Sequence, residues 1–390
     1  RRAGRAMTGD RWAVLGLAPP RAGWFSDVAQ WSTSASIPVD FVKCVTAAEV
    51  RARLHGGRPF CALLVDSDST GFDRDLVASA RAAGAATIVV GTRVVRDWDE
   101  LGVAAVLSTD LDREELLAAL RHHAVALADL DPVVPAPVAR LPRPWSGRLV
   151  AVTGTGGSGA SITAMALTQS MAAGASNRSL VLLADFALRA DQAMYHDARD
   201  IVPGVQELVE AHRSARLSSG RLRALAFDVV DREHHLLLGL RRPRDWTVLR
   251  PAAFDAAVDG LLHAYRLVIA DVDSDVEGEA ETGSLDVEDR NLMARSVLTR
   301  ADVVVVVAVA STGGLHALTR TTRSLVGFGV EPSVIVPVFS RTPRSRRRRA
   351  ELTTAVAALL AESEMNDLAN PVFVPERADI ETAIRDGQRL

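Results

Sequence analysis

The stretch Arg148-Leu-Val-Ala-Val-Thr-Gly-Thr-Gly-Gly-Ser-Gly-Ala-Ser161 joins an apolar run to a glycine-rich turn that ends in a hydroxyl residue. The apolar run predicts a buried strand at residues 149–152, and the sequence after the turn predicts a helix at residues 162–172. Glycines in such a turn let several backbone N–H groups converge, and the helix N-terminus adds the positive end of its dipole. The stretch therefore predicts a cradle for a phosphate group.

This stretch departs from the P-loop pattern G-x-x-x-x-G-K-[ST] at one position. Gly154, Gly159 and Ser161 match the pattern, but Ala160 stands where the pattern has lysine. The P-loop lysine neutralises charge on the β- and γ-phosphates, and the single lysine of this chain, Lys43, lies far upstream. We therefore expect weak nucleotide hydrolysis or none. Two alternatives stay open for the loop: it binds nucleotide, or it is a turn without a ligand.

Length and composition predict two domains with packed cores, since the chain has 390 residues and 48% of them are hydrophobic. The net charge of −3 argues against bulk attraction to nucleic acid or an anionic membrane, so such a contact would need a local patch. Cys44 and Cys61 lack metal-ligand spacing, which indicates a reduced, cytoplasmic protein. The longest apolar run, residues 303–310, is too short to span a bilayer.

The chain is predicted to hold a first domain at residues 10–126 and a second at residues 148–390. Residues 127–147 between them are rich in proline, which predicts an extended connector; the prolines are Pro132, Pro135, Pro137, Pro142 and Pro144. In the first domain, short apolar runs alternate with helical periodicity, so we expect an α/β fold with a parallel sheet and helices on both faces. The expected strands are 12–17, 61–65, 87–90 and 104–107, and the expected helices are 47–54, 74–83 and 113–126.

One predicted strand of the first domain ends at Asp66, and a later one leads into Val90-Gly-Thr92. These motifs resemble the phosphoacceptor and the switch hydroxyl of a response-regulator receiver, which has a flavodoxin-like fold. Two parts of the receiver site are replaced, because Gly16-Leu17-Ala18 stands for the acidic pair that holds Mg²⁺ and Thr109 stands for a lysine. We therefore interpret Asp66 as a solvated strand-end carboxylate, with phosphorylation as the alternative. The domain is interpreted as a pseudo-receiver that docks or dimerises.

Two predicted strands of the second half end in carboxylates, Asp185 and Asp271. The strand before Asp271 fits the Walker B pattern, whose carboxylate holds Mg²⁺ beside the P-loop hydroxyl, here Ser161. Acidic residues 273–289 follow, and they predict either a solvated loop or a moving switch. Further strands are expected at 303–310, 333–338 and 371–375, and a last helix at 378–388.

The segment Thr155-Gly-Gly-Ser-Gly-Ala-Ser161 resembles the deviant P-loop K-G-G-x-G-K-[ST] of the MinD/ParA ATPases, with both lysines replaced. The substituted loop resembles the CpaE/TadZ branch of that superfamily, close to actinobacterial septum-site-determining (Ssd) proteins. The resemblance implies a P-loop domain with a mostly parallel sheet. It also implies a first switch D-x-D-x-R that starts at Asp185, with Ala187 in place of the second acid and Arg189 kept.

The same resemblance implies which residues form the site. The nucleotide would be bound by Gly154, Thr155, Gly156, Gly157, Ser158, Gly159, Ala160 and Ser161. Asp185 and Asp271 would be the catalytic acids, while Ser161 and Asp271 would hold Mg²⁺ with ATP or ADP. Because Thr155, Ala160 and Ala187 replace three functional side chains, we expect a pseudo-ATPase or a very weak ATPase.

The resemblance implies a spatial regulator of septum placement and cell division, or of Tad-type pilus or secretion assembly. Such a protein would act through protein partners and a homodimer, with nucleotide as an optional ligand. It would be cytoplasmic and recruited to the septum, the pole or the inner face of the membrane. A partner would provide that recruitment, because no amphipathic tail of the MinD kind follows the last predicted helix.

Two alternative functions stay open. The first is a slow but active ATPase in which an arginine, Arg148 or Arg189, replaces the lysine. The second is a DNA-associated positioning protein that contacts the phosphate backbone through a basic cluster, formed by Arg344, Arg346, Arg347, Arg348 and Arg349. The competing interpretation of this cluster is a solvated helix start compensated by Glu351. His234 and His235 are interpreted as a polar pair beside a strand, because no further metal ligands match them.

Overall fold

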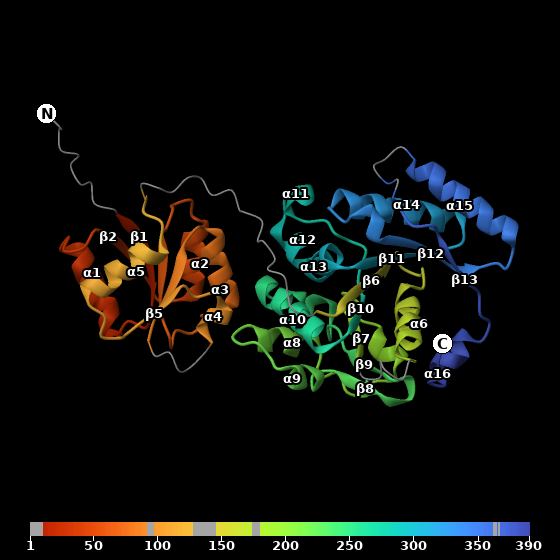
Figure 1. Cartoon of the computed structure of the whole chain (residues 1–390), viewed down its shortest axis with the longest axis horizontal. Helices are drawn as coiled ribbons and strands as arrows, with labels where there is room; N and C mark the ends of the chain where they lie inside the picture. Colours follow the sequence, from red (N-terminus) through yellow and green to blue (C-terminus); the bar gives the residue numbers. More distant parts are fainter. Residues whose placement is uncertain (1–10, 92–96, 128–145, 174–179, 362–364, 366) are drawn as a thin grey trace. The chain divides into compact units, whose positions relative to one another are not determined.

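The computed structural model describes residues 11–91, 97–127, 146–173, 180–361, 365 and 367–390 (Figure 1). It contains two compact units, one with the strands up to residue 107 and one with the strands from residue 148 onward. Each unit is described by itself. Thr92 and nearly all of the predicted connector, residues 128–145, lie outside the described residues.

The first unit is built on a five-stranded parallel sheet. Its strands are β1 (Trp12–Leu17), β2 (Val39–Cys44), β3 (Ala62–Asp66), β4 (Ala86–Val90) and β5 (Ala105–Leu107). They lie in the order β2-β1-β3-β4-β5, which is the flavodoxin-like order of doubly wound sheets. The parallel sheet that the sequence predicts is thus present. Cys44 and Cys61 are buried free thiols in this unit.

Helices cover both faces of this sheet. They are α1 (Gly23–Thr33), α2 (Ala47–His55), α3 (Arg74–Ala82), α4 (Trp98–Leu101) and α5 (Arg113–His123). On one face, Val14 of β1 packs in a core with Trp24 of α1 and Leu116 of α5. On the other face, Leu15 packs in a core with Val50 of α2. Successive β1 side chains enter opposite cores, which explains why this strand is apolar throughout.

Sequence patterns miss the short helix α4 and two longer elements of the first unit, α1 and β2. The buried residues of α1 are Trp24, Phe25 and Val28, too few to make a repeating apolar stripe. β2 is an edge strand whose middle residues are partly exposed, so its sequence has no continuous apolar run. Both elements keep one side toward solvent, and this weakens the apolar signal on which sequence prediction depends.

The second unit is built on an eight-stranded sheet. Its strands are β6 (Arg148–Gly154), β7 (Val181–Asp185), β8 (Phe227–Val229), β9 (His234–Leu237), β10 (Leu267–Asp271), β11 (Val303–Val309), β12 (Ile335–Thr342) and β13 (Val372–Pro375). They lie in the order β13-β12-β11-β6-β10-β7-β9-β8, and among these described strands only β8 is antiparallel to its neighbour. β6 is interior, so the loop after it opens at the carboxyl edge of the sheet, where open α/β sheets bind ligands.

Helices also cover both faces of the larger sheet. They are α6 (Ala160–Ala172), α7 (Gln192–Tyr195), α8 (Val205–His212), α9 (Ser219–Arg223), α10 (Pro251–Ala264), α11 (Glu279–Thr282), α12 (Leu285–Arg290), α13 (Leu292–Arg300), α14 (Thr312–Gly327), α15 (Arg346–Leu360) and α16 (Ile380–Arg385). Met165 of α6 packs with Val152 of β6 on one face, and Phe254 of α10 packs with Leu149 of β6 on the other. Of the helices that the structure describes, none has the length and hydropathy needed to cross a lipid bilayer.

The elements on either side of the glycine-rich loop have the predicted type and are longer than predicted. β6 continues to Gly154 because Thr153 and Gly154 pair with Val306 and Val307 of β11. α6 begins at Ala160, directly after the loop. The loop itself is therefore only residues 155–159, and its backbone is tightly constrained at both ends.

Candidate functional site

The loop between β6 and α6 has a glycine-dependent conformation. Gly157 and Gly159 have φ values of 78° and 86°, in the left-handed region that other residues rarely adopt. Ser340 of β12 donates its hydroxyl to the carbonyl oxygen of Ser158 at 2.6 Å. The loop is thus fixed from a neighbouring part of the sheet as well as by its own glycines.

Donor groups at the start of α6 are left available by this conformation. Within the described residues, no side chain caps α6 at Gly159, and the Ser158 hydroxyl, which is 2% exposed, has no hydrogen-bond partner. An uncapped helix N-terminus beside a buried, unsatisfied hydroxyl suits an anion. The predicted loop residues therefore fit a phosphate group, although Ala160 at the start of α6 provides no cation.

The two predicted acids, Asp185 and Asp271, lie side by side because β7 and β10 pair in parallel with these residues opposite each other. Both are buried, with exposed fractions of 0% and 3%. Burial, and then the charge of Asp271, raise the pKa of Asp185 well above its usual range. Burial raises the pKa of Asp271 to about 6. This environment favours the protonated form of Asp185, which makes it a poor proton acceptor.

Gln192 is a site residue that the sequence analysis misses. It begins α7 and is fully buried. Its Nε2 donates to Oδ2 of Asp271 at 2.7 Å and to the carbonyl oxygen of Ser161 at 3.0 Å, and its backbone N–H donates to Oδ2 of Asp185 at 2.9 Å. No motif marks this position. The only signal is a polar residue a few positions after Arg189 in the first switch segment.

The predicted Mg²⁺ residues, Ser161 and Asp271, already have a hydrogen-bond donor between them and their neighbours. Ser161 and Asp271 do lie together, because the Ser161 side chain hydrogen-bonds to Asp271. Oδ2 of Asp271 already accepts the Gln192 amide N–H, so a donor hydrogen takes one of the lone-pair directions through which this carboxylate could bind a cation. Ser161 and Asp271 are thus brought together, with the Gln192 amide against one oxygen of Asp271, and their role in holding Mg²⁺ stays a prediction.

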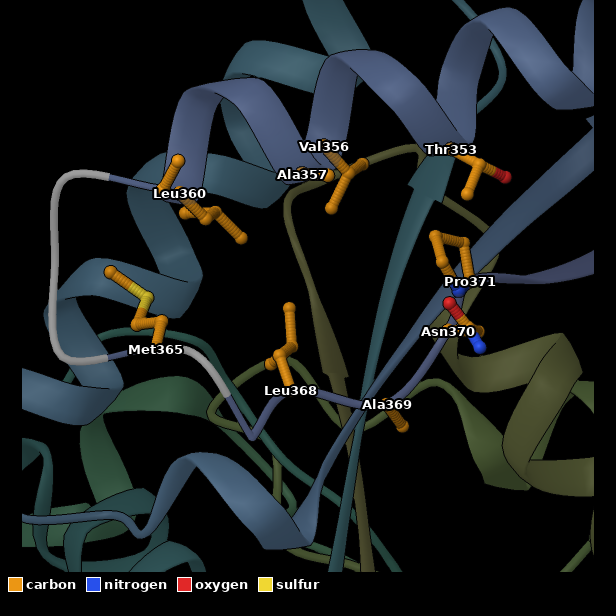
Figure 2. Close-up of a pocket in the computed structure, with 10 residues that line it drawn as sticks. Thr353, Val356, Ala357, Leu360, Met365, Leu368, Ala369, Asn370 and Pro371 are labelled. Carbon is orange, nitrogen blue, oxygen red and sulfur yellow. The ribbon is translucent and has the colours of Figure 1, made fainter.

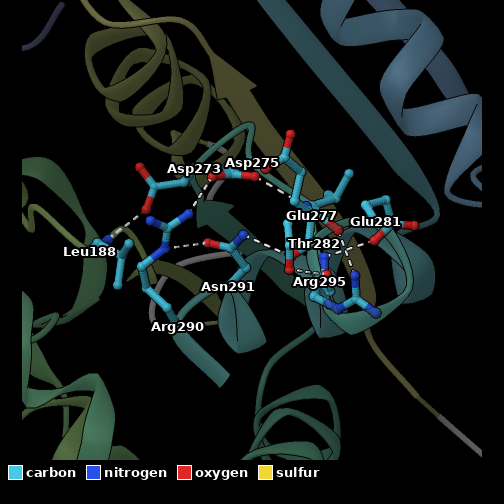
Figure 3. A network of polar contacts seen from close by, with 11 residues as sticks. Leu188, Asp273, Asp275, Glu277, Glu281, Thr282, Arg290, Asn291 and Arg295 are labelled. Carbon is cyan, nitrogen blue, oxygen red and sulfur yellow. Dashed lines mark hydrogen bonds and ion pairs between the residues drawn. The ribbon is translucent and has the colours of Figure 1, made fainter. Parts of the chain in front are cut away.

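The acidic segment after β10 is ordered by its own polar network (Figure 3). Arg290 pairs with Asp275 at 2.6 Å, and Nδ2 of the buried Asn291 donates to the carbonyl oxygen of Glu277 at 2.8 Å. Oδ2 of Asp273 accepts the backbone N–H of Leu188 at 2.7 Å, which joins this segment to the one after β7. The segment forms the short helices α11 and α12 and not a loop, and neither helix has a buried residue, so it is solvent-accessible as expected.

Of the two arginines considered as a substitute for lysine, Arg148 is misplaced. It begins β6, at the opposite end of the strand from the loop, and its Nη1 pairs with Oδ1 of Asp302 at 2.6 Å. A strand of this length separates its two ends by roughly 20 Å, so Arg148 does not reach a phosphate in the loop. Arg189 lies near Asp273, two positions after Asp271, since its charge lowers the pKa of Asp273 against the larger effect of burial.

The basic cluster, Arg344 and Arg346–Arg349, lies at the beginning of α15, with Arg344 just before the helix. Ser345 caps this helix by accepting the backbone N–H of Arg348. Arg347 and Arg348 both pair with Glu351, at 2.9 Å and 3.4 Å, as the competing interpretation of this cluster expects. The Arg347 side chain is nevertheless 90% exposed, so its guanidinium stays accessible.

His234 pairs with a histidine that the sequence does not place beside it, His196. Their Nε2 atoms are 3.2 Å apart, and their Nδ1 atoms face the carbonyl oxygens of Arg232 and Gln192. Burial lowers the pKa of His196 to about 3 and that of His234 to about 4. Groups of three or more metal-ligating side chains are absent from the described residues. The lowered pKa values keep both buried rings neutral at pH 7, and His196 contacts the backbone carbonyl oxygen of Gln192.

This pair predicts a loss of stability in mild acid. Since each ring has a folded-state pKa below the ordinary 6.5, the unfolded chain binds protons first as the pH falls. The contribution is complete above pH 6.5. It is lost between pH 6.5 and about 4 for His234 and between pH 6.5 and about 3 for His196, at up to about 1.4 kcal/mol per pH unit for each ring. We expect His196→Asn and His234→Asn each to flatten the pH dependence of urea unfolding relative to wild type.

The raised pKa of Asp271 makes the folded state more stable as the pH falls, which is opposite to the effect of the two histidines. Comparison of each variant with wild type at the same pH removes this contribution, because Asp271 is present in both. His316→Asn, on an exposed position of α14, is the matched control. Parallel pH profiles for wild type and both histidine variants would contradict the prediction.

In the first unit, Asp66 is half-buried and hydrogen-bonded, in contrast to the solvated carboxylate that we expect from sequence. Nε1 of Trp24 donates to Oδ2 of Asp66 at 2.9 Å, and the backbone N–H of Asp68 donates to Oδ1 at 3.0 Å. A Cβ at Gly16 would lie 2.3 Å from Cζ of Phe41, so aromatic rings fill the space beside the end of β1. These contacts make Asp66 part of the packing of the unit.

Removal of the indole donor is expected to destabilise the first unit. Trp24→Phe should lower the free energy of unfolding by about 1.5–3 kcal/mol more than the loss of ring volume alone, because a hydrogen bond to a carboxylate is broken. Trp12→Phe is the control, since Trp12 is equally buried and its Nε1 has no partner among the described residues. Equal losses for the two variants in urea unfolding would show that the Trp24–Asp66 contact is not stabilising.

A cavity of about 200 Å³ lies away from the loop, between α15 and the segment before β13 (Figure 2). Its lining side chains include Val356, Leu360, Leu368 and Pro371, and none of the lining residues is ionisable. A phosphate group would find no charged partner there. This cavity is therefore not the candidate nucleotide site.

Comparisons with known proteins agree with the fold of the second unit. The ParA family ATPase from Chlorobium tepidum TLS is similar to this chain with a TM-score of 0.50 and 16% identity, over 63% of this chain and 91% of that one. The septum site-determining protein MinD from Pyrococcus horikoshii OT3, complexed with Mg-ADP, has a TM-score of 0.45 and 14% identity, over 62% and 87%. A chain of the MinC:MinD cell division protein complex from Aquifex aeolicus has a TM-score of 0.44 and 15% identity, over 63% of this chain and 87% of that one.

No protein-family model matches the chain, and no curated protein matches it. At 16% identity, the similarity to the ParA family ATPase shows the fold alone. The second unit thus has a ParA-like P-loop fold.

Proposed function

We propose that this protein is a spatial regulator that acts through protein contacts, with a P-loop unit that binds nucleotide weakly and hydrolyses little or none of it. The observation that carries the proposal is a loop shaped for a phosphate group that lacks the charged side chains of the MinD/ParA pattern. Ser158 and the uncapped start of α6 suit a phosphate group, whereas Ala160 and Ala187 replace the lysine and the second acid. Such a site retains binding geometry and lacks the groups that stabilise charge in phosphoryl transfer.

The cellular role that we propose is placement of the septum or assembly of a Tad-type pilus or secretion system, as in CpaE/TadZ and Ssd proteins. The substituted loop Thr155–Ser161 supports this assignment, since both lysines of the MinD/ParA pattern are absent. In the flavodoxin-like first unit, Asp66 accepts a hydrogen bond from Trp24, which makes it a poor phosphoacceptor. This supports a docking or dimerising role for the unit in place of phosphotransfer. The proposed partners are a second copy of this chain and a protein of one of these machineries.

The experiment that tests the proposal combines a binding and a turnover measurement. Calorimetric titration with ATP and with ADP should give dissociation constants in the micromolar range or weaker, and phosphate release should not exceed the blank. Sedimentation with and without ATP then tests the homodimer. Steady phosphate release that Asp271→Ala abolishes would contradict the non-hydrolysing part, and would favour the slow ATPase with Arg189 as the substitute cation. Absence of any binding heat or thermal stabilisation would contradict nucleotide binding.

A second candidate function is association with DNA through the basic cluster at the start of α15. The observation in its favour is the 90% exposed side chain of Arg347. Contacts with phosphates would give sequence-independent binding that weakens steeply with salt. Replacement of Arg344 and Arg346–Arg349 by alanine should then abolish binding to a random duplex at 50 mM salt. Unchanged binding would remove this candidate.

A further inference from the structure

Gln192 connects three elements of the site: the end of β7, the end of β10 and the start of α6. Its side-chain Nε2 bonds to the carbonyl oxygen of Ser161 at the start of α6 and to Oδ2 of Asp271 at the end of β10. Its backbone N–H bonds to Oδ2 of Asp185 at the end of β7. Gln192 is fully buried, so these bonds form out of contact with solvent.

The identity of the amide atom that faces the site follows from its partners. The carbonyl oxygen of Ser161 and the ionised carboxylate of Asp271 can only accept hydrogen bonds, so the atom between them is the nitrogen. Both amide hydrogens are thus used, whereas the amide oxygen is buried without a partner in the described parts of the chain. The orientation that satisfies two acceptors is retained although it leaves one acceptor unsatisfied.

A divalent cation in a P-loop site would lie between the same two residues, although it would bind the hydroxyl of Ser161 and not its carbonyl oxygen. It would bind the hydroxyl at the start of the helix, here Ser161, and approach the strand-end carboxylate, here Asp271. Magnesium requires oxygen ligands arranged in an octahedron. In this chain an N–H group, positive at its hydrogen, already lies against Oδ2 of Asp271, and a fully buried side chain carries it.

We propose that the Gln192 amide takes the place of the divalent cation, so that the loop takes a nucleoside di- or triphosphate without metal. This inference rests on the proposed function only for the identity of the ligand. The bridging role of Gln192 stands on the hydrogen bonds alone. The phosphate charge would then be met by backbone N–H groups of the loop, by Ser158 and by Arg189.

The test compares three proteins: wild type, Gln192→Ala and the control Gln169→Ala. Gln169 is a buried glutamine on α6, 3% exposed, whose Oε1 accepts the backbone N–H of Leu390 outside the site. Calorimetry measures ADP binding to each protein in excess EDTA and in excess Mg²⁺. We expect less than a twofold difference between the two conditions for wild type and the control, and at least a tenfold gain with Mg²⁺ for Gln192→Ala.

Each outcome decides the inference. A tenfold gain with Mg²⁺ in wild type would overturn it, and so would metal-independent ADP binding that Gln192→Ala retains unchanged. If none of the proteins binds ADP, nucleotide binding fails as part of the proposed function, and the bridge is tested separately through thermal stability. Gln192→Ala and Asp271→Asn should then lower the melting temperature by amounts that do not add in the double variant. Additive losses would overturn the bridge.

Discussion

Gly154→Ala is expected to destabilise the second unit strongly. Gly154 ends β6, and a Cβ there would lie 2.4 Å from the carbonyl oxygen of Val307 on β11 and 2.5 Å from Oγ of Ser158. Because Val307 belongs to an adjacent interior strand, its carbonyl cannot move without disturbing the hydrogen-bonded ladder. Overpacking of this kind should lower the free energy of unfolding by about 2–4 kcal/mol, measured by urea unfolding.

The matched control for this prediction is Gly156→Ala in the same loop. A Cβ at Gly156 meets no atom within 4 Å, and its φ is not in the left-handed region. Its effect on stability should therefore stay within about 0.5 kcal/mol. Equal effects of the two variants would show that the close approach of β6, β11 and Ser158 is not a constraint on the fold.

Ala160→Lys is expected to raise the affinity for ATP about 10- to 100-fold. Ala160 begins α6 and is half-buried at the loop, so a lysine there would add one charge-assisted hydrogen bond, worth about 1.5–3 kcal/mol. We expect no matching gain in turnover, because Ala187 and Gln192 are unchanged. Calorimetric titration with ATP and a phosphate-release assay measure the two effects.

Ala160→Met is the control, since it adds a side chain of similar length without charge. It should leave the affinity for ATP unchanged or lower it. A gain with methionine as large as that with lysine would mean that contact area, not charge, limits binding. A lack of any gain with lysine would contradict the interpretation that the loop cradles phosphates.

Local chemistry made the core of the site predictable. A strand, a glycine turn and a helix follow one another within Arg148–Ala172, so the hydrophobic pattern and the glycines are enough to find them. Asp185 and Asp271 each end an apolar run, and the carboxyl ends of parallel strands meet at one edge of a sheet. The absence of a lysine at position 160 is likewise a fact of sequence.

Contacts between distant segments could not be predicted in this way. Trp24 reaches Asp66 across 42 positions, and Gln192 reaches Asp271 across 79. Arg148 illustrates the opposite error, because nearness to the loop in sequence concealed its place at the far end of β6. In each case the partner depends on which strands are neighbours and how they are paired. The local sequence pattern contains no information about strand order or strand pairing.

The sequence by itself thus determined the α/β class, the phosphate loop and the missing cations, because each depends on residues a few positions apart. The tertiary structure alone decided that the two acids lie opposite each other and are buried, and that Gln192 bridges Asp271 to Ser161. The physical reason is that strand order and register bring these groups within hydrogen-bond distance, where burial and directional bonding, rather than residue type, set what the site can bind.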